Sequence, residues 1–199
     1  MDTNFDFIAG SLCLDFCNTA EPAVHGGPEE PFVVYEDLLI WGRLAGTLGD
    51  AHADALARFA RQEPGQAGKV LKRARALRLA LQGVFFAAAR NREVPRPDLD
   101  LLNREISLAL PNMRIQNGSG SFRWAWSGDA SSIDQPLWAV VRSAGEMLTS
   151  EHIVRVGQCH GDACAYLFLD STKNRSRQWC DTRVCGNRSR VSRYRERRS

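Results

Sequence analysis

The sequence predicts a mostly helical α+β chain, in which an N-terminal helical domain carries one β-hairpin and a small C-terminal domain ends in a basic helix. Three observations support this class. Apolar residues recur at helical spacing through most of the first 150 positions. The pattern switches to strand-like alternation around one Asn-Gly-Ser-Gly turn. Four of the six cysteines lie close together near the C-terminal end. We therefore divide the chain into residues 1–152 and 153–199.

The composition is that of an ordinary globular protein. Of the 199 residues, 44% are hydrophobic and 25% are charged, which disfavours disorder, collagen and coiled coil. The length suits either one large domain or one mid-sized domain with a small appendage. No apolar run is long enough to span a membrane, and the start lacks the basic region of a secretory signal. We expect a cytoplasmic protein that does not partner a membrane.

Apolar stripes and their breakers place the helices of the first domain. Residues 12–17 (LCLDFC) fit either a short helix with Ser11 as its N-cap or a strand, and we favour the helix. Residues 21–31, rich in Pro and Gly, predict a loop. Longer helices are expected over 35–48, stopped by Gly49, over 51–61, ended near Pro64-Gly65, and over 68–91, 98–110 and 133–150.

The hairpin is expected over residues 113–126, with its turn at Asn117-Gly118-Ser119-Gly120. Three aromatic residues alternate along its second strand and share one face: Phe122, Trp124 and Trp126. Packing within a half-buried sheet is favoured over a ligand-stacking role.

The net charge of +3 hides a strong asymmetry. From residue 171 to residue 199, ten Lys or Arg face two acidic residues, a formal charge of +8, which leaves −5 for the first 170 residues. A cationic tip on a mildly acidic body indicates an anionic partner, with nucleic acid the leading candidate.

The clustered cysteines form two pairs of equal spacing. Four residues separate Cys159 from Cys164 and also Cys180 from Cys185, and fifteen residues separate the pairs. In a reducing compartment such pairs indicate metal ligands, and four thiolates suit tetrahedral Zn²⁺. His160 could replace one thiolate, and an iron–sulfur cluster could accept the same set, but the spacing favours zinc. Four thiolates leave no open position, so we predict one structural zinc ion.

The same residues resemble the CGNR zinc-finger family, named for the tetrapeptide found here from Cys185 to Arg188. The match includes Phe168, Asp170, the run Asn174-Arg175-Ser176-Arg177, and Trp179-Cys180. The preceding part resembles the ABATE domain in Leu14-Asp15-Phe16, Asn18-Thr19, Asp37-Leu38 and Trp41. The resemblance implies a bacterial transcription regulator, linked in part to stress, with a DNA-binding role for the finger.

Within the finger we expect a strand over 165–170, a return strand over 177–180 and a helix over 188–198, a treble-clef-like arrangement. Asp170 is expected to hold an arginine or cap a turn, and Gly186 to allow close passage past the metal. Asn187 is expected to adopt a left-handed backbone or to bond to a turn.

Arginine forks can grip phosphate and read guanine edges, so the basic residues of this end are candidate nucleic-acid contacts. They are Lys173, Arg175, Arg177, Arg183, Arg188, Arg190, Arg193 and Arg197. The competing interpretation is a frayed basic tail. A second basic face, on the helix over 68–91, fits a solvated surface better than a nucleic-acid site.

Enzymatic function is not predicted, because no phosphate-binding loop, GxSxG, HExxH or dinucleotide motif is present. Asp15, Asn18 and Asp37 are candidates for a ligand pocket, although capping or turn roles fit them better. Cys13 and Cys17 are expected to be small core residues rather than a redox pair.

The leading hypothesis is a zinc-dependent, DNA-binding transcription regulator whose N-terminal domain senses a small-molecule effector or forms a homodimer. One alternative is a module that binds RNA or an acidic protein through the same basic tip. The other is a small-molecule-binding enzyme domain with a structural zinc.

Overall fold

The computed structural model describes residues 5–20, 30–118 and 120–196 of the chain. The predicted loop at 21–31 lies mostly outside these ranges. The helices are α1 Leu12–Cys17, α2 Tyr35–Leu44, α3 Asp50–Gln62, α4 Pro64–Ala89, α5 Arg96–Ala109, α6 Gln135–Leu148 and α7 Asn187–Glu196. The strands are β1 Met113–Gly118, β2 Ser121–Trp126, β3 Val156–Gln158 and β4 Leu167–Leu169, and the short helical turns are η1 Leu110–Asn112, η2 Glu151–Arg155 and η3 Thr182–Gly186.

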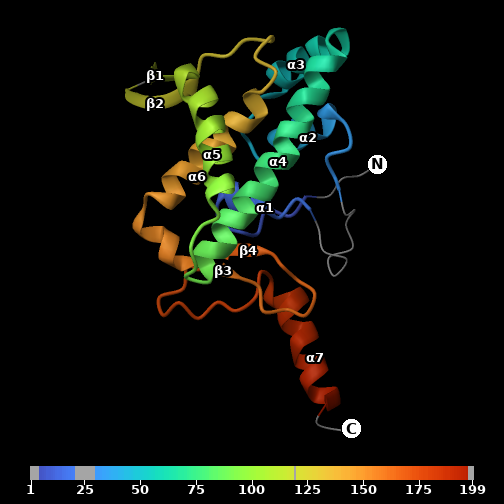
Figure 1. Cartoon of the computed structure of the whole chain (residues 1–199), viewed down its shortest axis with the longest axis vertical. Helices are drawn as coiled ribbons and strands as arrows, with labels where there is room; N and C mark the ends of the chain where they lie inside the picture. The colour runs from blue at the N-terminus through green and yellow to red at the C-terminus, as the bar shows by residue number, and fades with distance from the viewer. Residues whose placement is uncertain (1–4, 21–29, 119, 197–199) are drawn as a thin grey trace.

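The body is a helical bundle in which the long helix α4 runs beside α5, with α1 and α6 packed across them (Figure 1). The predicted stripe of α4 is buried from Val70 to Phe85. The short helix at 12–17 is confirmed as α1, with five of its six residues buried. Ser11 stands at the N-cap position, but its side chain makes no capping bond. Within the described ranges, no helix has the length and apolar character that a membrane span needs.

Two helix boundaries differ from the prediction by more than two residues. Helix α2 ends at Leu44, because Gly46 takes a left-handed φ of 70° and the N–H groups of Thr47 and Leu48 turn back to the Gly42 carbonyl. Gly49 therefore precedes α3 instead of stopping α2. Pro64, expected to end a helix, is the first residue of α4, a position where its missing N–H costs nothing.

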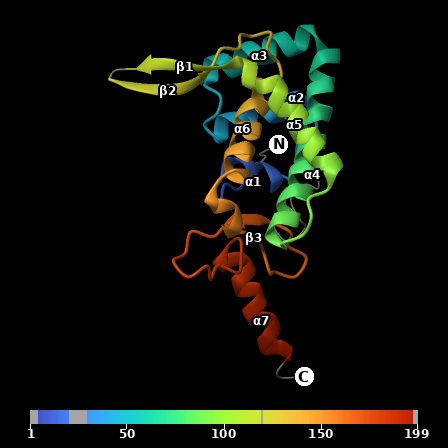
Figure 2. The ribbon, with the colours of Figure 1, turned by 60° about the vertical axis from the view of Figure 1, so that its left-hand side comes forward.

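The hairpin of β1 and β2 is confirmed, with Gly118 paired to Ser121 across the turn. It projects sideways from one end of the bundle (Figure 2). Its aromatic face is therefore covered near the base and exposed toward the tip: Trp126 packs against Trp138 with the rings tilted, while Trp124 is 51% exposed and Phe122 is 77% exposed. The predicted half-buried packing is correct for Trp126 and wrong for the outer aromatic residues.

The C-terminal part begins with a small sheet whose pairing differs from the prediction. Strand β4 pairs antiparallel with β3, which lies before the first cysteine, and the expected return strand at 177–180 is absent. Gly157 allows this pairing, because a Cβ there would lie 2.8 Å from the Phe168 ring. The sheet shares its side chains between two cores: Leu167 packs into the helical bundle, and Phe168 packs among the cysteines.

Asn18, at the end of α1, fastens this sheet to the bundle. Its Nδ2 donates to the Leu167 carbonyl at 2.8 Å, and its Oδ1 accepts from the Leu167 N–H at 2.9 Å. Asn18 is buried and Leu167 is fully buried, so water cannot replace these bonds.

We expect Asn18→Ala to lower the free energy of unfolding by about 2–5 kcal/mol, because two buried backbone groups lose their partner. Chemical denaturation followed by far-UV circular dichroism measures the change. The control is Asn103→Ala at an exposed position of α5, expected to cost less than about 0.5 kcal/mol. Equal losses in both variants would show that Asn18 does not fasten the two parts together.

Candidate functional site

The four clustered cysteines converge on one point below the bundle. Their sulfur atoms all lie within 4.8 Å of one another, and all four residues are buried. The Cys164–Cys180 and Cys180–Cys185 Sγ–Sγ distances are both 3.7 Å. Tetrahedral zinc with Zn–S bonds of about 2.3 Å separates its sulfurs by about 3.8 Å. The donor set therefore fits one zinc ion, and two of the sulfur–sulfur distances match the tetrahedral spacing.

The first cysteine pair sits on a tight turn. Ala163 adopts a left-handed φ of 58°, which turns the chain back so that Cys164 faces Cys159. Gly161 lies against the sulfurs: its N–H donates to Cys159 Sγ at 3.4 Å, and a Cβ there would lie 3.1 Å from Cys185 Sγ. Gly161 is not among the site residues predicted from the sequence, although a glycine between two close ligands is the signal that marks such an approach.

The second pair is joined to the start of the terminal helix. Cys180 precedes Asp181, whose carboxylate accepts from the Arg183 N–H at 2.6 Å and so caps the turn η3. Cys185 lies in this turn, and α7 begins two residues later at Asn187. Asn187 has ordinary right-handed helical angles, so the expected left-handed conformation is wrong. A Cβ at Gly186 would lie 3.3 Å from Thr182 and 3.5 Å from Trp179, so the turn passes close to both side chains.

The sulfurs alone make an electrostatically unfavourable group. Contact with Cys159 raises the pKa of Cys164 to about 12, and contacts with Cys159 and then Cys164 raise the pKa of Cys180. Burial also raises the pKa of Cys185. Four buried thiolates need a cation at their centre, which is the property of a metal site. His160 is exposed and belongs to no metal-ligating group within the described residues.

Arg177, a predicted nucleic-acid contact, is instead a structural residue of the finger. Its Nε donates to the Trp179 carbonyl at 3.1 Å, and its guanidinium lies 4.6 Å from the centre of the Phe168 ring. Its terminal nitrogens donate to three further carbonyls, those of Ile8, Leu169 and Cys180. Every nitrogen of the fork thus donates within the chain, so we expect Arg177 to hold the finger together rather than to contact a partner.

Asp170 organises the loop that leads to Arg177. Its carboxylate accepts from the N–H and hydroxyl of Thr172 at 2.8 and 2.6 Å, and from the Arg177 N–H at 2.9 Å. These bonds hold the pKa of Asp170 below its usual range, against the effect of burial. The expected turn-capping role is confirmed.

The other basic candidates lie on the surface of the finger and of α7. Lys173, Arg175, Arg183, Arg188 and Arg190 are exposed. Arg193 lies on α7, but its side chain is outside the description, as is the whole of Arg197. Helix α7 extends away from the body in both views (Figures 1 and 2). Within the described residues, α7 is therefore a cationic helix on which Arg188 and Arg190 are exposed to solvent.

The basic side of α4 is largely occupied within the chain. Arg73 donates to Glu105 at 2.7 Å, Arg75 to the Phe32 carbonyl, and the buried Arg78 to Glu30. This face holds the bundle together, so neither a solvated surface nor a nucleic-acid site describes those three arginines.

Asp15, Asn18 and Asp37, considered for a ligand pocket, each have a local role. Asp15 accepts from the Ala9 N–H at 2.9 Å, and burial raises its pKa to about 6. Asp37 accepts from the N–H groups of Val33 and Val34 at the start of α2. With Asn18 bound to Leu167, the capping and bridging roles account for all three. Cys13 and Cys17 are buried core residues, as expected.

Two family models match successive parts of the chain. The family ABATE, described as "putative stress-induced transcription regulator", matches residues 10–151. The CGNR zinc finger matches residues 155–198, which contain all four cysteines. Both families are of regulator or zinc-finger type rather than enzymatic. A search of curated proteins found no match.

Proposed function

The chain belongs to the ABATE family and ends in a CGNR zinc finger with one structural zinc site, and from this premise we propose that it is a DNA-binding transcription regulator. The observation that carries the proposal is α7, an exposed basic helix that starts two residues after the zinc ligand Cys185. The N-terminal domain is proposed to be the regulatory part, which senses an effector or forms a homodimer, in a cytoplasmic protein.

The dimensions and charge of α7 support this role. Its ten residues extend about 15 Å, and a major groove of about 12 Å width admits such a helix. Arg188 and Arg190 are exposed near its start. Guanidinium groups there can contact phosphates, which provides affinity, and base edges, which provides sequence specificity. Exposed Lys173, Arg175 and Arg183 from the finger widen the proposed phosphate-contacting surface.

Zinc, when bound, supplies the cross-link that a short polar segment needs in order to fold. The residues of the chain then set the direction of the helix. Cys185 holds the turn η3, and the Asp181 cap fixes the same turn from its start. The basic helix is thereby anchored at one end, and the other end is open to a partner.

We expect the double variant Arg188→Gln/Arg190→Gln to bind duplex DNA at least about tenfold more weakly at moderate salt, because two phosphate contacts are lost. The slope of log affinity against log salt should fall by about 2. Fluorescence anisotropy with a labelled duplex, on the zinc-loaded full chain, measures both quantities.

The matched control is Arg58→Gln/Arg61→Gln, which removes the same charge from exposed positions of α3 at the far end of the molecule (Figure 1). The control should keep the affinity and salt slope of the unmodified chain. An equal loss of DNA affinity in the two variants would show that only the net charge of the chain matters, and would overturn the proposal. Structured RNA that displaces duplex DNA at equal concentration would favour the RNA-binding alternative.

A further inference from the structure

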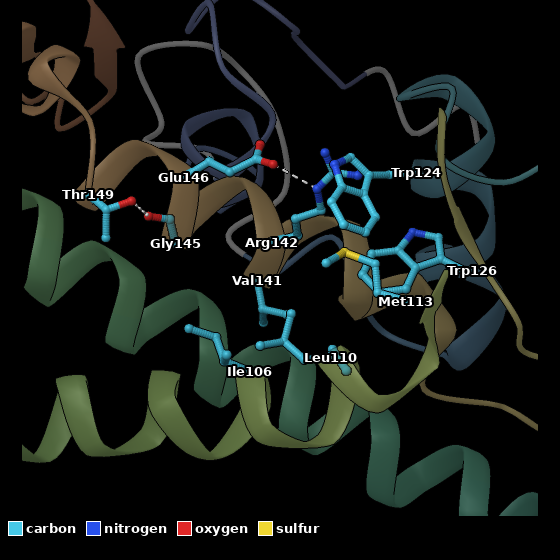
Figure 3. A pocket seen from close by; sticks show the side chains of 11 residues that line it. Ile106, Leu110, Met113, Trp124, Trp126, Val141, Arg142, Gly145, Glu146 and Thr149 are labelled. Atoms are coloured by element: carbon cyan, nitrogen blue, oxygen red, sulfur yellow. Dashed lines mark hydrogen bonds and ion pairs between the residues drawn. The ribbon is translucent and has the colours of Figure 1, made fainter. Parts of the chain in front are cut away.

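A pocket of about 320 Å³ lies at the base of the hairpin, far from the zinc site and unused by the proposed DNA contacts. One wall consists of Trp124 and Trp126 from β2, and the opposite side consists of Ile106 from α5 and Val141 from α6 (Figure 3). Its volume is at the lower end of the range for small-molecule sites, roughly 300–1,000 Å³. The space suits a ligand of one or two rings.

The aromatic wall is held in place before any ligand arrives. Trp126 lies 5.6 Å from the buried ring of Trp138, measured between ring centres. Gly128 permits this contact, since a Cβ there would lie 2.7 Å from the Trp138 ring. The Ser127 N–H and hydroxyl both donate to the Asn112 carbonyl, at 2.8 and 3.0 Å, and close the hairpin base. A wall fixed in advance loses little entropy on binding.

Gly145 leaves the α6 side of the pocket open. In a helix interior glycine costs about 1 kcal/mol relative to alanine, so its presence there calls for a reason. A Cβ at Gly145 would meet just one atom within 4 Å, Ile106 Cδ1 at 3.9 Å. Steric crowding therefore does not require glycine at this position. What glycine provides here is empty volume between α5 and α6.

The polar side chains that border this apolar space come from α6 and its C-cap: Arg142, Glu146 and Thr149. The guanidinium of Arg142 lies 5.7 Å from the centre of the Trp124 ring, and its Nε donates to Glu146 at 2.7 Å. Figure 3 shows the guanidinium next to the Trp124 ring, with Glu146 on its other side. The terminal nitrogens of Arg142 have no hydrogen-bond partner within the described part of the chain. They can donate to an acceptor on the edge of a ligand that lies against Trp124.

We propose that this pocket binds a small planar aromatic molecule with one hydrogen-bond-accepting edge, stacked on Trp124 and Trp126 and held at its edge by Arg142. The inference rests on the proposed function in one respect, because it gives the regulatory N-terminal domain its effector site. It replaces the pocket first considered at Asp15, Asn18 and Asp37. The concave shape and rigid wall favour a small molecule over a second copy of the chain.

The experiment titrates 2-naphthol, a neutral two-ring probe, into ¹⁵N-labelled, zinc-loaded full chain up to about 1 mM, a range suited to a weak small ligand. The five tryptophans each give one indole N–H signal. We expect saturable shifts of the Trp124 and Trp126 signals, with those of Trp41 and Trp179 unmoved. Trp→Phe variants assign the signals.

Three variants test the geometry. Trp124→Ala removes part of the stacking wall, and Gly145→Leu fills the space while raising helix propensity. Each should weaken naphthol binding at least about tenfold. Arg142→Met should weaken it about fivefold through the lost hydrogen bond. The control, Phe122→Ala, removes an aromatic residue from the same face of β2 outside the pocket, and should leave affinity unchanged.

Absence of saturable shifts would overturn the inference, as would undiminished binding by a folded Gly145→Leu variant. An equal loss in Phe122→Ala would show non-specific adsorption to the hairpin, and tryptophan shifts that depend on protein concentration alone would show a self-association surface. Either result also overturns it. The titration contains no DNA. A failure to bind naphthol would therefore leave the proposed DNA binding untouched, and a failure to bind DNA would leave the naphthol result untouched.

Discussion

Replacing the zinc ligand Cys180 by alanine is expected to abolish stoichiometric zinc binding and to unfold the finger. The finger has a small core of its own, made of the four cysteines with Tyr166 and Phe168. A core of this size cannot offset the entropy of ordering the segment. Structural zinc contributes an apparent 10–16 kcal/mol, roughly, in zinc-finger peptides at neutral pH, so its loss removes the largest stabilising contribution here.

The damage should extend into the helical bundle, because β4 belongs to both cores. Leu167 is fully buried in the bundle, while its neighbour Phe168 packs on the zinc side. When the finger unfolds, Leu167 loses the strand pairing with Gln158 that helps to hold it. We therefore expect Cys180→Ala to unfold the residues after 158 and also to lower the melting temperature of the whole chain.

Zinc content by elemental analysis and thermal unfolding followed by circular dichroism measure the two effects. The matched control is Cys17→Ala, which removes a fully buried thiol outside the cluster and should keep one zinc per chain. Its cost is that of a small cavity, about 1–2 kcal/mol. A full zinc content in Cys180→Ala would contradict the assignment of Cys180 as a ligand of a structural zinc ion. So would a Cys17→Ala variant that keeps its zinc but is destabilised as much as Cys180→Ala.

The sequence was sufficient where a local pattern has one physical solution. The equal spacing of the two cysteine pairs predicts a metal site without reference to the rest of the fold, and the four sulfurs do converge. The apolar stripe of α4 predicts a buried helix face in the same way. The stretch Asn117-Gly118-Ser119-Gly120 between alternating residues predicts the hairpin, because few turns connect such strands, although Asn117 and Gly118 belong to β1 itself.

The errors fall where a partner distant in sequence decides the outcome. Residues 177–180 were expected to pair with β4, yet β3 takes that place, and the choice depends on how Asn18 docks Leu167 onto the bundle. The charge of Arg177 was visible, but its four side-chain hydrogen bonds to carbonyls were not, since one of those carbonyls belongs to Ile8. The pocket combines side chains from three separate segments, so no local motif marks it.

Arg177→Met is expected to destabilise the finger by about 3 kcal/mol or more, and to lower DNA affinity only as far as it unfolds the finger. Methionine keeps most of the apolar stem over the Phe168 ring and removes every donor. The carbonyls of Ile8, Leu169, Trp179 and Cys180 then lose the fork that joins them. Lost hydrogen bonds from a charged group cost about 1.5–3 kcal/mol each, and those near the zinc ligand are shielded from water.

Arg175→Met, two residues earlier at an exposed position, is the matched control because it removes the same charge without the buried contacts. It should leave thermal unfolding unchanged and reduce the salt slope of DNA binding by about 1, as expected for a phosphate contact. Arg177→Met should lower the thermal stability of the chain. Measured at a temperature where the variant is still folded, its DNA binding should keep the salt slope of the unmodified chain. Arg177→Lys should restore little, since one ammonium cannot reach carbonyls on several sides. A folded Arg177→Met variant of normal stability that has lost salt-dependent affinity would return Arg177 to the DNA-contacting set.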